Sequence, residues 1–95
     1  MNPDSESGYS LNRRMRVLVV EDEPRLRHVL MKAIPDMGFD VAEAARGSEA
    51  MQVFETAAPD IVVLDLNLPD MDGIELFELA RKKWPRTEFI VLTLS

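Results

Sequence analysis

The sequence contains no cysteine, which excludes disulfide bonds, thiolate nucleophiles and cysteine-ligated metal sites. It also lacks long apolar runs: the longest cover four residues, whereas a helix needs about 20 to cross a bilayer. The N-terminus has no apolar core of the kind found in signal peptides. The lack of cysteine fits a reducing compartment. Together with the short apolar runs and the missing signal-peptide core, it leads us to expect a cytoplasmic protein with no membrane association.

Basic residues are in the minority. The chain has 11 lysines and arginines against 17 aspartates and glutamates, a net charge of −6. Proteins that bind nucleic acid do so largely by neutralising phosphates with positive charge. The sign of the charge therefore argues against direct binding to nucleic acid.

The length and composition indicate one folded domain. The chain has 95 residues, of which 46% are hydrophobic and 29% charged, as in an ordinary globular domain. Residues 1–14 hold Pro3, Gly8 and three serines but few large apolar side chains. We therefore expect 1–14 to be a flexible lead-in and 15–95 to form the domain.

Four segments predict strands. Residues 17–20, 61–64 and 89–92 are apolar at every position. Such runs are typical of parallel strands that are covered on both faces. Residues 40–44 alternate between polar and apolar side chains instead, so this strand is expected at an edge of the sheet.

Helices are predicted between the strands. The first is indicated by apolar residues three and four apart, at Leu26, Val29, Leu30, Ala33, Ile34 and Met37. Pro24 suits its first turn, whereas Pro35 should kink or loosen its last turn. A second helix is predicted over 48–57, with Ser48 as its N-cap, and a third over 74–84. Alternating strands and helices imply right-handed crossovers and a doubly wound α/β sheet.

Acidic side chains follow two of the apolar strands. Glu21, Asp22 and Glu23 come directly after residues 17–20, and Asp65 comes directly after residues 61–64. A hydroxyl side chain, Thr93, follows residues 89–92. In an open α/β sheet, sites form beyond the carboxyl ends of the strands. Carboxylates gathered there repel one another unless a cation lies among them, and Mg²⁺ prefers such oxygen ligands.

The chain resembles the receiver domain of two-component response regulators, the CheY-like family, in three segments. These are VVEDEP at 19–24, LDLNLPDMDG at 64–73 and VLT at 91–93. The resemblance covers residues 15–95 in matching order and spacing. It implies a flavodoxin-like parallel sheet with strand order 2-1-3-4, here without the family's fifth strand and last helices.

The resemblance implies a role for each matching residue. Asp65 corresponds to the phosphoacceptor, which takes a phosphoryl group from a phosphohistidine. Mg²⁺ would be held by Glu21, Asp22, Asp65 and the main-chain carbonyl of Asn67. Thr93 corresponds to the switch hydroxyl.

Further expectations concern the loop and the partners. Pro69 would stiffen the loop after the phosphoacceptor, and Gly73 would permit the turn into the next helix. The family's partner is a sensor histidine kinase or a phosphotransfer protein. The chain is thus expected to be a signalling domain rather than an enzyme.

Two family features have no counterpart in the sequence. The family uses a lysine at the end of its fifth strand, but Lys32, Lys82 and Lys83 all fall in predicted helices. Without a fifth strand, residues 89–92 would be an apolar edge with unpaired backbone groups. The hypothesis is that the chain is a fragment of a longer regulator or hides this edge by pairing with another chain.

Other interpretations of the acidic residues stay open. Asp65 could be a solvated acid, and Glu21 and Asp22 could simply favour the dipole of the following helix. The missing lysine is compatible with a pseudo-receiver that keeps the fold as an interaction module without phosphorylation. A Mg²⁺-dependent phosphatase of the haloacid dehalogenase class also uses an aspartate nucleophile, but it needs a second aspartate where this chain has Asn67.

Overall fold

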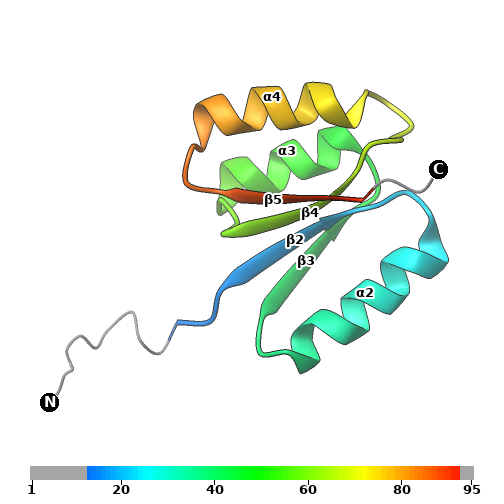
Figure 1. The fold of residues 1–95 in the computed structure, drawn as a ribbon, viewed down its shortest axis with the longest axis vertical. Coiled ribbons are helices and arrows are strands. Elements are labelled where there is room, and N and C mark those ends of the chain that lie inside the picture. Colours follow the sequence, from blue (N-terminus) through cyan, green and yellow to red (C-terminus); the bar gives the residue numbers. More distant parts are fainter. Residues whose placement is uncertain (1–12, 93–95) are drawn as a thin grey trace, which may run out of the picture.

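The computed structural model describes residues 13–92. Its elements, in chain order, are β2 (Arg16–Val20), α2 (Pro24–Asp36), β3 (Asp40–Ala44), α3 (Gly47–Thr56), β4 (Ile61–Asp65), α4 (Gly73–Lys83) and β5 (Glu88–Leu92) (Figure 1). Strands and helices alternate as predicted. Within residues 13–92, no helix combines the length and the apolar character that a membrane span requires.

The four strands form one parallel sheet in the order β3-β2-β4-β5. In chain order this is 2-1-3-4, so the predicted flavodoxin-like arrangement is confirmed. β3 lies at one edge, as its alternating pattern predicts. Val20 of β2 lies level with Leu64 of β4, so the residues that follow these two strands emerge side by side.

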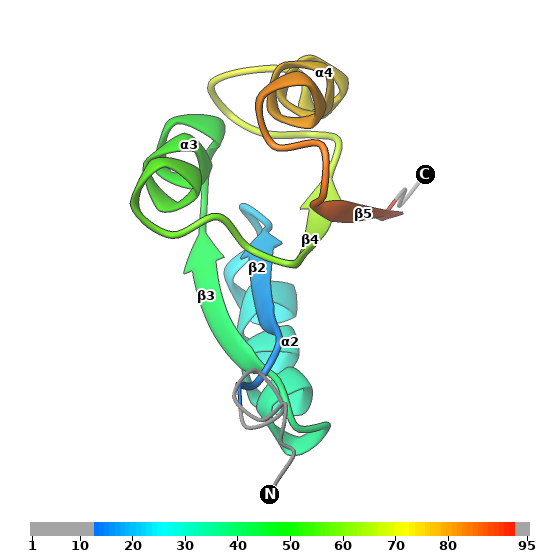
Figure 2. The ribbon, with the colours of Figure 1, turned by 90° about the vertical axis from the view of Figure 1, so that its left-hand side faces the viewer.

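Helices cover both faces of the sheet. Helix α2 lies on one side, and α3 and α4 lie on the other (Figure 2). Apolar side chains fill the space between the sheet and α3 and α4, with their centre at Leu18, Val20, Ala44, Ala50, Phe54, Val62, Leu64, Leu76 and Ala80. A smaller cluster of Val17, Val19 and Ile34 lies under α2. Removing these surfaces from water is the main stabilising contribution.

Helix α2 buries a narrower face than its apolar pattern predicts. Ile34 is buried, but Val29 is 58% and Met37 is 68% exposed, so the expectation that both face the core is wrong. At 3.6 residues per turn, Val29 is rotated by about 140° from Ile34. Met37 lies beyond the helix, which ends at Asp36, directly after Pro35. The i→i−3 hydrogen bonds of Met37 to Ile34 and of Gly38 to Pro35 close this last turn.

Strand β5 is the second edge of the sheet, and one prediction about it is wrong. Its apolar pattern predicts coverage on both faces, but Ile90 is 53% and Val91 is 44% exposed. Ile90 lies level with Val63 on the face that α2 covers, but α2 packs mainly against β2 and β3, so Ile90 is left exposed. Val91 points to the opposite face, as Phe89 does. On that face, Phe89 is half-buried and meets Phe77 of α4 edge-on, with ring centroids 5.0 Å apart.

Candidate functional site

Three acidic side chains converge at the carboxyl edge of the sheet. Glu21 and Asp22 follow β2 directly, and Asp65 is the last residue of β4. Because β2 and β4 are parallel neighbours, the three carboxylates meet: one oxygen from each lies within 4.8 Å of the others. The structure therefore brings together the side chains that the sequence pattern indicates.

Two of these carboxylates are buried. Glu21 is 2% and Asp65 is 6% exposed, whereas Asp22 faces solvent. Glu21 Oε2 accepts a hydrogen bond from the Glu23 amide (3.0 Å), and Asp65 Oδ1 accepts one from the Asn67 amide (3.1 Å). Glu21 Oε1 is buried without a partner among the described residues. A charged oxygen that is buried without a partner costs free energy, so this oxygen is expected to bind a ligand.

Burial and repulsion both act on Glu21. Burial raises the pKa of Glu21 above its ordinary value of 4.5, and the negative charges of Asp65 and Asp22 raise it further. The hydrogen bond from the Glu23 amide opposes this shift by favouring the ionised carboxylate. A cation among the three carboxylates would remove the repulsion.

The donor set suits a hard divalent cation. Carboxylate and carbonyl oxygens are the ligands that Mg²⁺ prefers, and it commonly retains several waters. Asp22, Asn67 and Pro69 line an open hollow of about 560 Å³ beside the carboxylates, which leaves room for water and a ligand. The residues present therefore fit Mg²⁺.

The loop between β4 and α4 is tightly folded. Asn67 pairs with Asp72 in an isolated antiparallel bridge, and the Gly73 amide donates to the Leu66 carbonyl (2.9 Å). A Cβ on Gly73 would lie 2.6 Å from Leu66 Cα and 2.7 Å from the Asp65 carbonyl oxygen. Gly73 is thus required for this close approach of the main chain, whereas the sequence suggested a need for backbone freedom at the turn.

The N-cap of α3 differs from the prediction. The sequence predicts Ser48 as the cap, but the helix begins at Gly47, and Arg46 at the N-cap position forms no side-chain cap. Asp70 of the β4–α4 loop takes this role instead, because its carboxylate accepts from the amides of Gly47 (2.8 Å) and Ser48 (2.9 Å). Local sequence offers no signal for a partner this distant along the chain.

The remaining predicted residues lie away from the carboxylates or outside the described part. Thr93 is outside the described residues. Lys32 lies on α2, and Lys82 and Lys83 lie in the last turn of α4, so all three are on helices as predicted. Lys83, at the C-terminal end of α4, forms a salt bridge with Glu55 at 2.8 Å.

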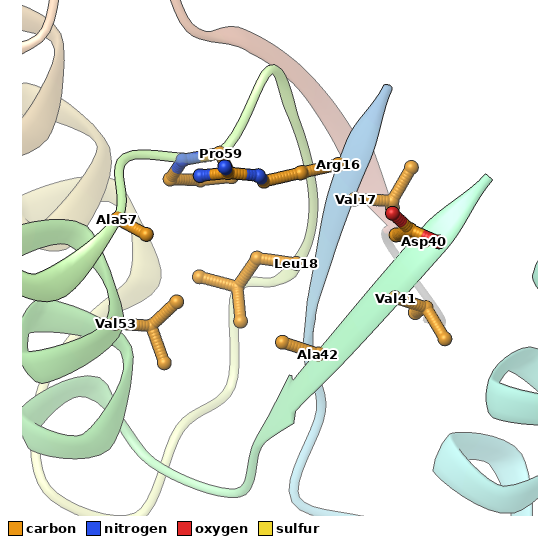
Figure 3. Close-up of a pocket in the computed structure, with 9 residues that line it drawn as sticks. All are labelled: Arg16, Val17, Leu18, Asp40, Val41, Ala42, Val53, Ala57 and Pro59. Atoms are coloured by element: carbon orange, nitrogen blue, oxygen red, sulfur yellow. The ribbon is translucent and has the colours of Figure 1, made fainter. Parts of the chain in front are cut away.

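A second cavity lies at the opposite, amino edge of the sheet. It has a volume of about 230 Å³ and lies where β2 and β3 meet the end of α3. Figure 3 shows Leu18 and Val53 facing one another across it, with Ala57 and Pro59 at its rim. Asp40 is the one acid in its lining, so this cavity does not repeat the carboxylate cluster.

Comparison with known proteins agrees with this geometry. Residues 17–95 match the response regulator receiver domain family. The transcriptional regulatory protein TrcR of Mycobacterium tuberculosis is 40% identical over 79 residues, which cover 83% of this chain and 31% of TrcR. The chain thus spans about a third of the length of that relative.

Solved receiver structures share the fold. The chemotaxis response regulator CheY4 of Vibrio cholerae has a TM-score of 0.81 at 30% identity, over 86% of this chain and 70% of CheY4. The response regulator TrrA, crystallised in complex with the histidine kinase ThkA, has a TM-score of 0.77 at 35% identity, over 83% of this chain and 68% of the matched chain. Together with the fold and the acidic edge, these matches show that the chain belongs to the response regulator receiver domain family of two-component systems.

Proposed function

We propose that this receiver domain accepts a phosphoryl group on Asp65, with Mg²⁺ held by Glu21, Asp22, Asp65 and the main-chain carbonyl of Asn67. The observation that carries the proposal is the cluster of three carboxylates within 4.8 Å. The unpaired, buried Glu21 Oε1 supports it, because a purely structural acid would be expected to have a donor at each buried oxygen.

The proposed chemistry is a transfer between two nucleophiles. A carboxylate oxygen of Asp65 attacks phosphorus, the bond between phosphorus and the histidine nitrogen breaks, and its electron pair returns to the imidazole. The product is an acyl phosphate on Asp65. Bound Mg²⁺ would neutralise negative charge on the phosphoryl oxygens. The amide of Asn67 holds Asp65 Oδ1 and so orients the nucleophile.

The proposed phosphodonor is a sensor histidine kinase or a phosphotransfer protein. Likeness to TrrA, which was crystallised with a histidine kinase, supports this choice. The domain would then act as a signalling module, and its catalysis would be limited to its own phosphorylation and dephosphorylation. The absence of cysteine is compatible with the cytoplasmic location that we propose for it.

Intact-mass spectrometry after incubation with Mg²⁺ and a small acyl phosphate tests the proposal. We expect the wild type to gain one phosphoryl group, and Asp65→Asn to gain none. Asp36→Asn, which changes an exposed acid at the end of α2, is the matched control and should react as the wild type does. Chelation of Mg²⁺ should abolish the adduct.

Two other outcomes identify the alternative functions. A wild type that binds Mg²⁺ but forms no adduct, with the acyl phosphate or with a phosphorylated kinase, would favour a pseudo-receiver. Steady turnover of a phosphomonoester would favour a phosphatase. The second is disfavoured by Asn67, which stands where that class has its second aspartate.

A further inference from the structure

Arg27 of α2 reaches back to the loop that carries two of the acids. Its Nη1 donates to the main-chain carbonyl of Glu21 at 2.8 Å and to that of Asp22 at 3.4 Å. Its Nε donates to Glu43 Oε1 of β3 at 3.0 Å. With its side chain only 21% exposed, Arg27 joins α2, the β2–α2 loop and the edge strand.

The loop is held from several directions. The Glu21 amide donates to the Ala44 carbonyl (3.0 Å), which fixes the side facing β3. The Glu23 amide donates to Glu21 Oε2 (3.0 Å), which fixes the Glu21 side chain. Arg27 holds the carbonyl oxygens, which these two bonds leave unconstrained. Its planar guanidinium sets the directions of its donors, so it fixes the orientation of the peptide groups as well as their position.

The contribution of Arg27 is expected to be mainly geometric. Its charge is largely offset by Glu43, and a pair with a partner that is 54% exposed contributes little free energy in water. The bonds to the two carbonyls, in contrast, act on the residues whose side chains face Asp65. A small rotation of these peptide groups would displace both carboxylates at once.

We propose that Arg27 is a positioning residue for the metal site, which orients the main chain of Glu21 and Asp22 so that their carboxylates face Asp65. The inference rests on the proposed function, because it concerns the affinity of the same site for Mg²⁺. Residues that orient metal ligands typically change metal affinity by about 10- to 100-fold when they are replaced.

Calorimetric titration of the purified chain with Mg²⁺ tests the role of Arg27. We expect Arg27→Ala and Arg27→Lys each to lose about tenfold or more in affinity for Mg²⁺. Lysine should not rescue the site, because it keeps the positive charge but lacks the planar guanidinium with its fixed donor directions. Glu43→Gln should bind as the wild type does. Arg25→Ala is the matched control, since Arg25 is exposed on the same helix and forms no side-chain hydrogen bond with another described residue.

Hydrogen exchange gives a second readout without metal. In Arg27→Ala the Glu23 amide should exchange faster than in the wild type, while amides of β4 stay protected. Circular dichroism establishes whether each variant is folded. If Arg27→Ala does not fold, the same measurement is made on Arg27→Lys.

The outcomes separate the two proposals. Wild-type affinity in Arg27→Lys, or an equal loss in Glu43→Gln, would overturn the positioning role and leave Mg²⁺ binding intact. A wild type that binds no Mg²⁺ would overturn the proposed function itself, and the positioning role with it.

Discussion

The carboxylate of Asp70 closes the N-terminus of α3, because it accepts a hydrogen bond from the Gly47 amide at 2.8 Å across 23 positions of sequence. The adjoining Ser48 amide donates to the second oxygen at 2.9 Å. Asp70 belongs to the loop that follows the phosphoacceptor candidate Asp65. These two hydrogen bonds therefore connect the first turn of α3 to this loop, and we expect both segments to be destabilised when the bonds are removed.

Replacing Asp70 should lower stability in a pH-dependent way. The two amides lower the pKa of Asp70 below 3.8, so the ionised carboxylate stabilises the fold at any pH above 3.8. This contribution is lost as the pH falls through the lowered pKa. Asp70→Ala should therefore melt at a lower temperature than the wild type at pH 7, and the difference should shrink below pH 4. Thermal melts over this range measure it. Glu78→Ala, at an exposed position of α4, is the control, and an equal effect there would contradict the prediction.

Gly47 has no room for a side chain. A Cβ there would collide with Met71 Sδ and would lie 2.6 Å from Met71 Cγ. We expect Gly47→Ala to reduce the free energy of unfolding by about 1–3 kcal/mol, the usual cost of overpacking. Since Met71 is flexible, Met71→Ala in the same chain should recover part of the loss. Denaturant unfolding of the double-mutant cycle measures the coupling, and strictly additive effects would contradict the contact.

Gly73 should affect both stability and the site. A Cβ would meet main-chain atoms of Leu66 and Asp65, which cannot move aside as a flexible side chain can. Gly73→Ala should therefore cost about 1–3 kcal/mol or more and weaken Mg²⁺ binding, because relief of the clash displaces Asp65. Gly38→Ala is the control: Gly38 has φ +99° in open space, so alanine there should cost about 1–2 kcal/mol with unchanged Mg²⁺ affinity. Unfolding and calorimetry together distinguish the two glycines.

Mg²⁺ should stabilise the domain through the three carboxylates. A ligand at 100 times its dissociation constant raises the free energy of unfolding by about 2.7 kcal/mol. In the absence of Mg²⁺, Asp65→Asn should be more stable than the wild type, because it removes a negative charge beside the buried Glu21. Melting curves with and without Mg²⁺ test both points. An equal gain from Mg²⁺ in the wild type and in the variant Asp65→Asn would argue against this site.

We also propose that the exposed edge at β5 promotes self-association of the chain. Ile90 is 53% exposed on an edge strand, where free backbone groups can pair with another strand. Ile90→Lys should shift sedimentation toward the monomer, since a charged edge discourages pairing. Val29→Lys changes a residue that is 58% exposed on α2 and should leave the distribution as it is. A wild type that stays monomeric at high concentration would contradict the proposal.

The strands and the acidic edge are predictable from sequence, because both follow from short-range pattern. Four consecutive apolar residues favour burial on two faces, and so a parallel sheet covered by helices, which holds for β2 but not for the edge strand β5. Acids placed directly after such strands must then emerge at its carboxyl edge. The pattern alone therefore locates Glu21, Asp22 and Asp65 at this edge, and the family resemblance adds the strand order.

Contacts between distant segments were decided only by the tertiary structure. Asp70 replaces the predicted cap Ser48 because folding carries a loop to the start of α3, and Arg27 reaches the loop after β2 because α2 packs back over that strand. Val29 remains exposed to solvent because α2 packs against the sheet through a different face. In each case the outcome depends on how far one element is rotated or shifted against another, and periodicity within a single segment contains no information about that.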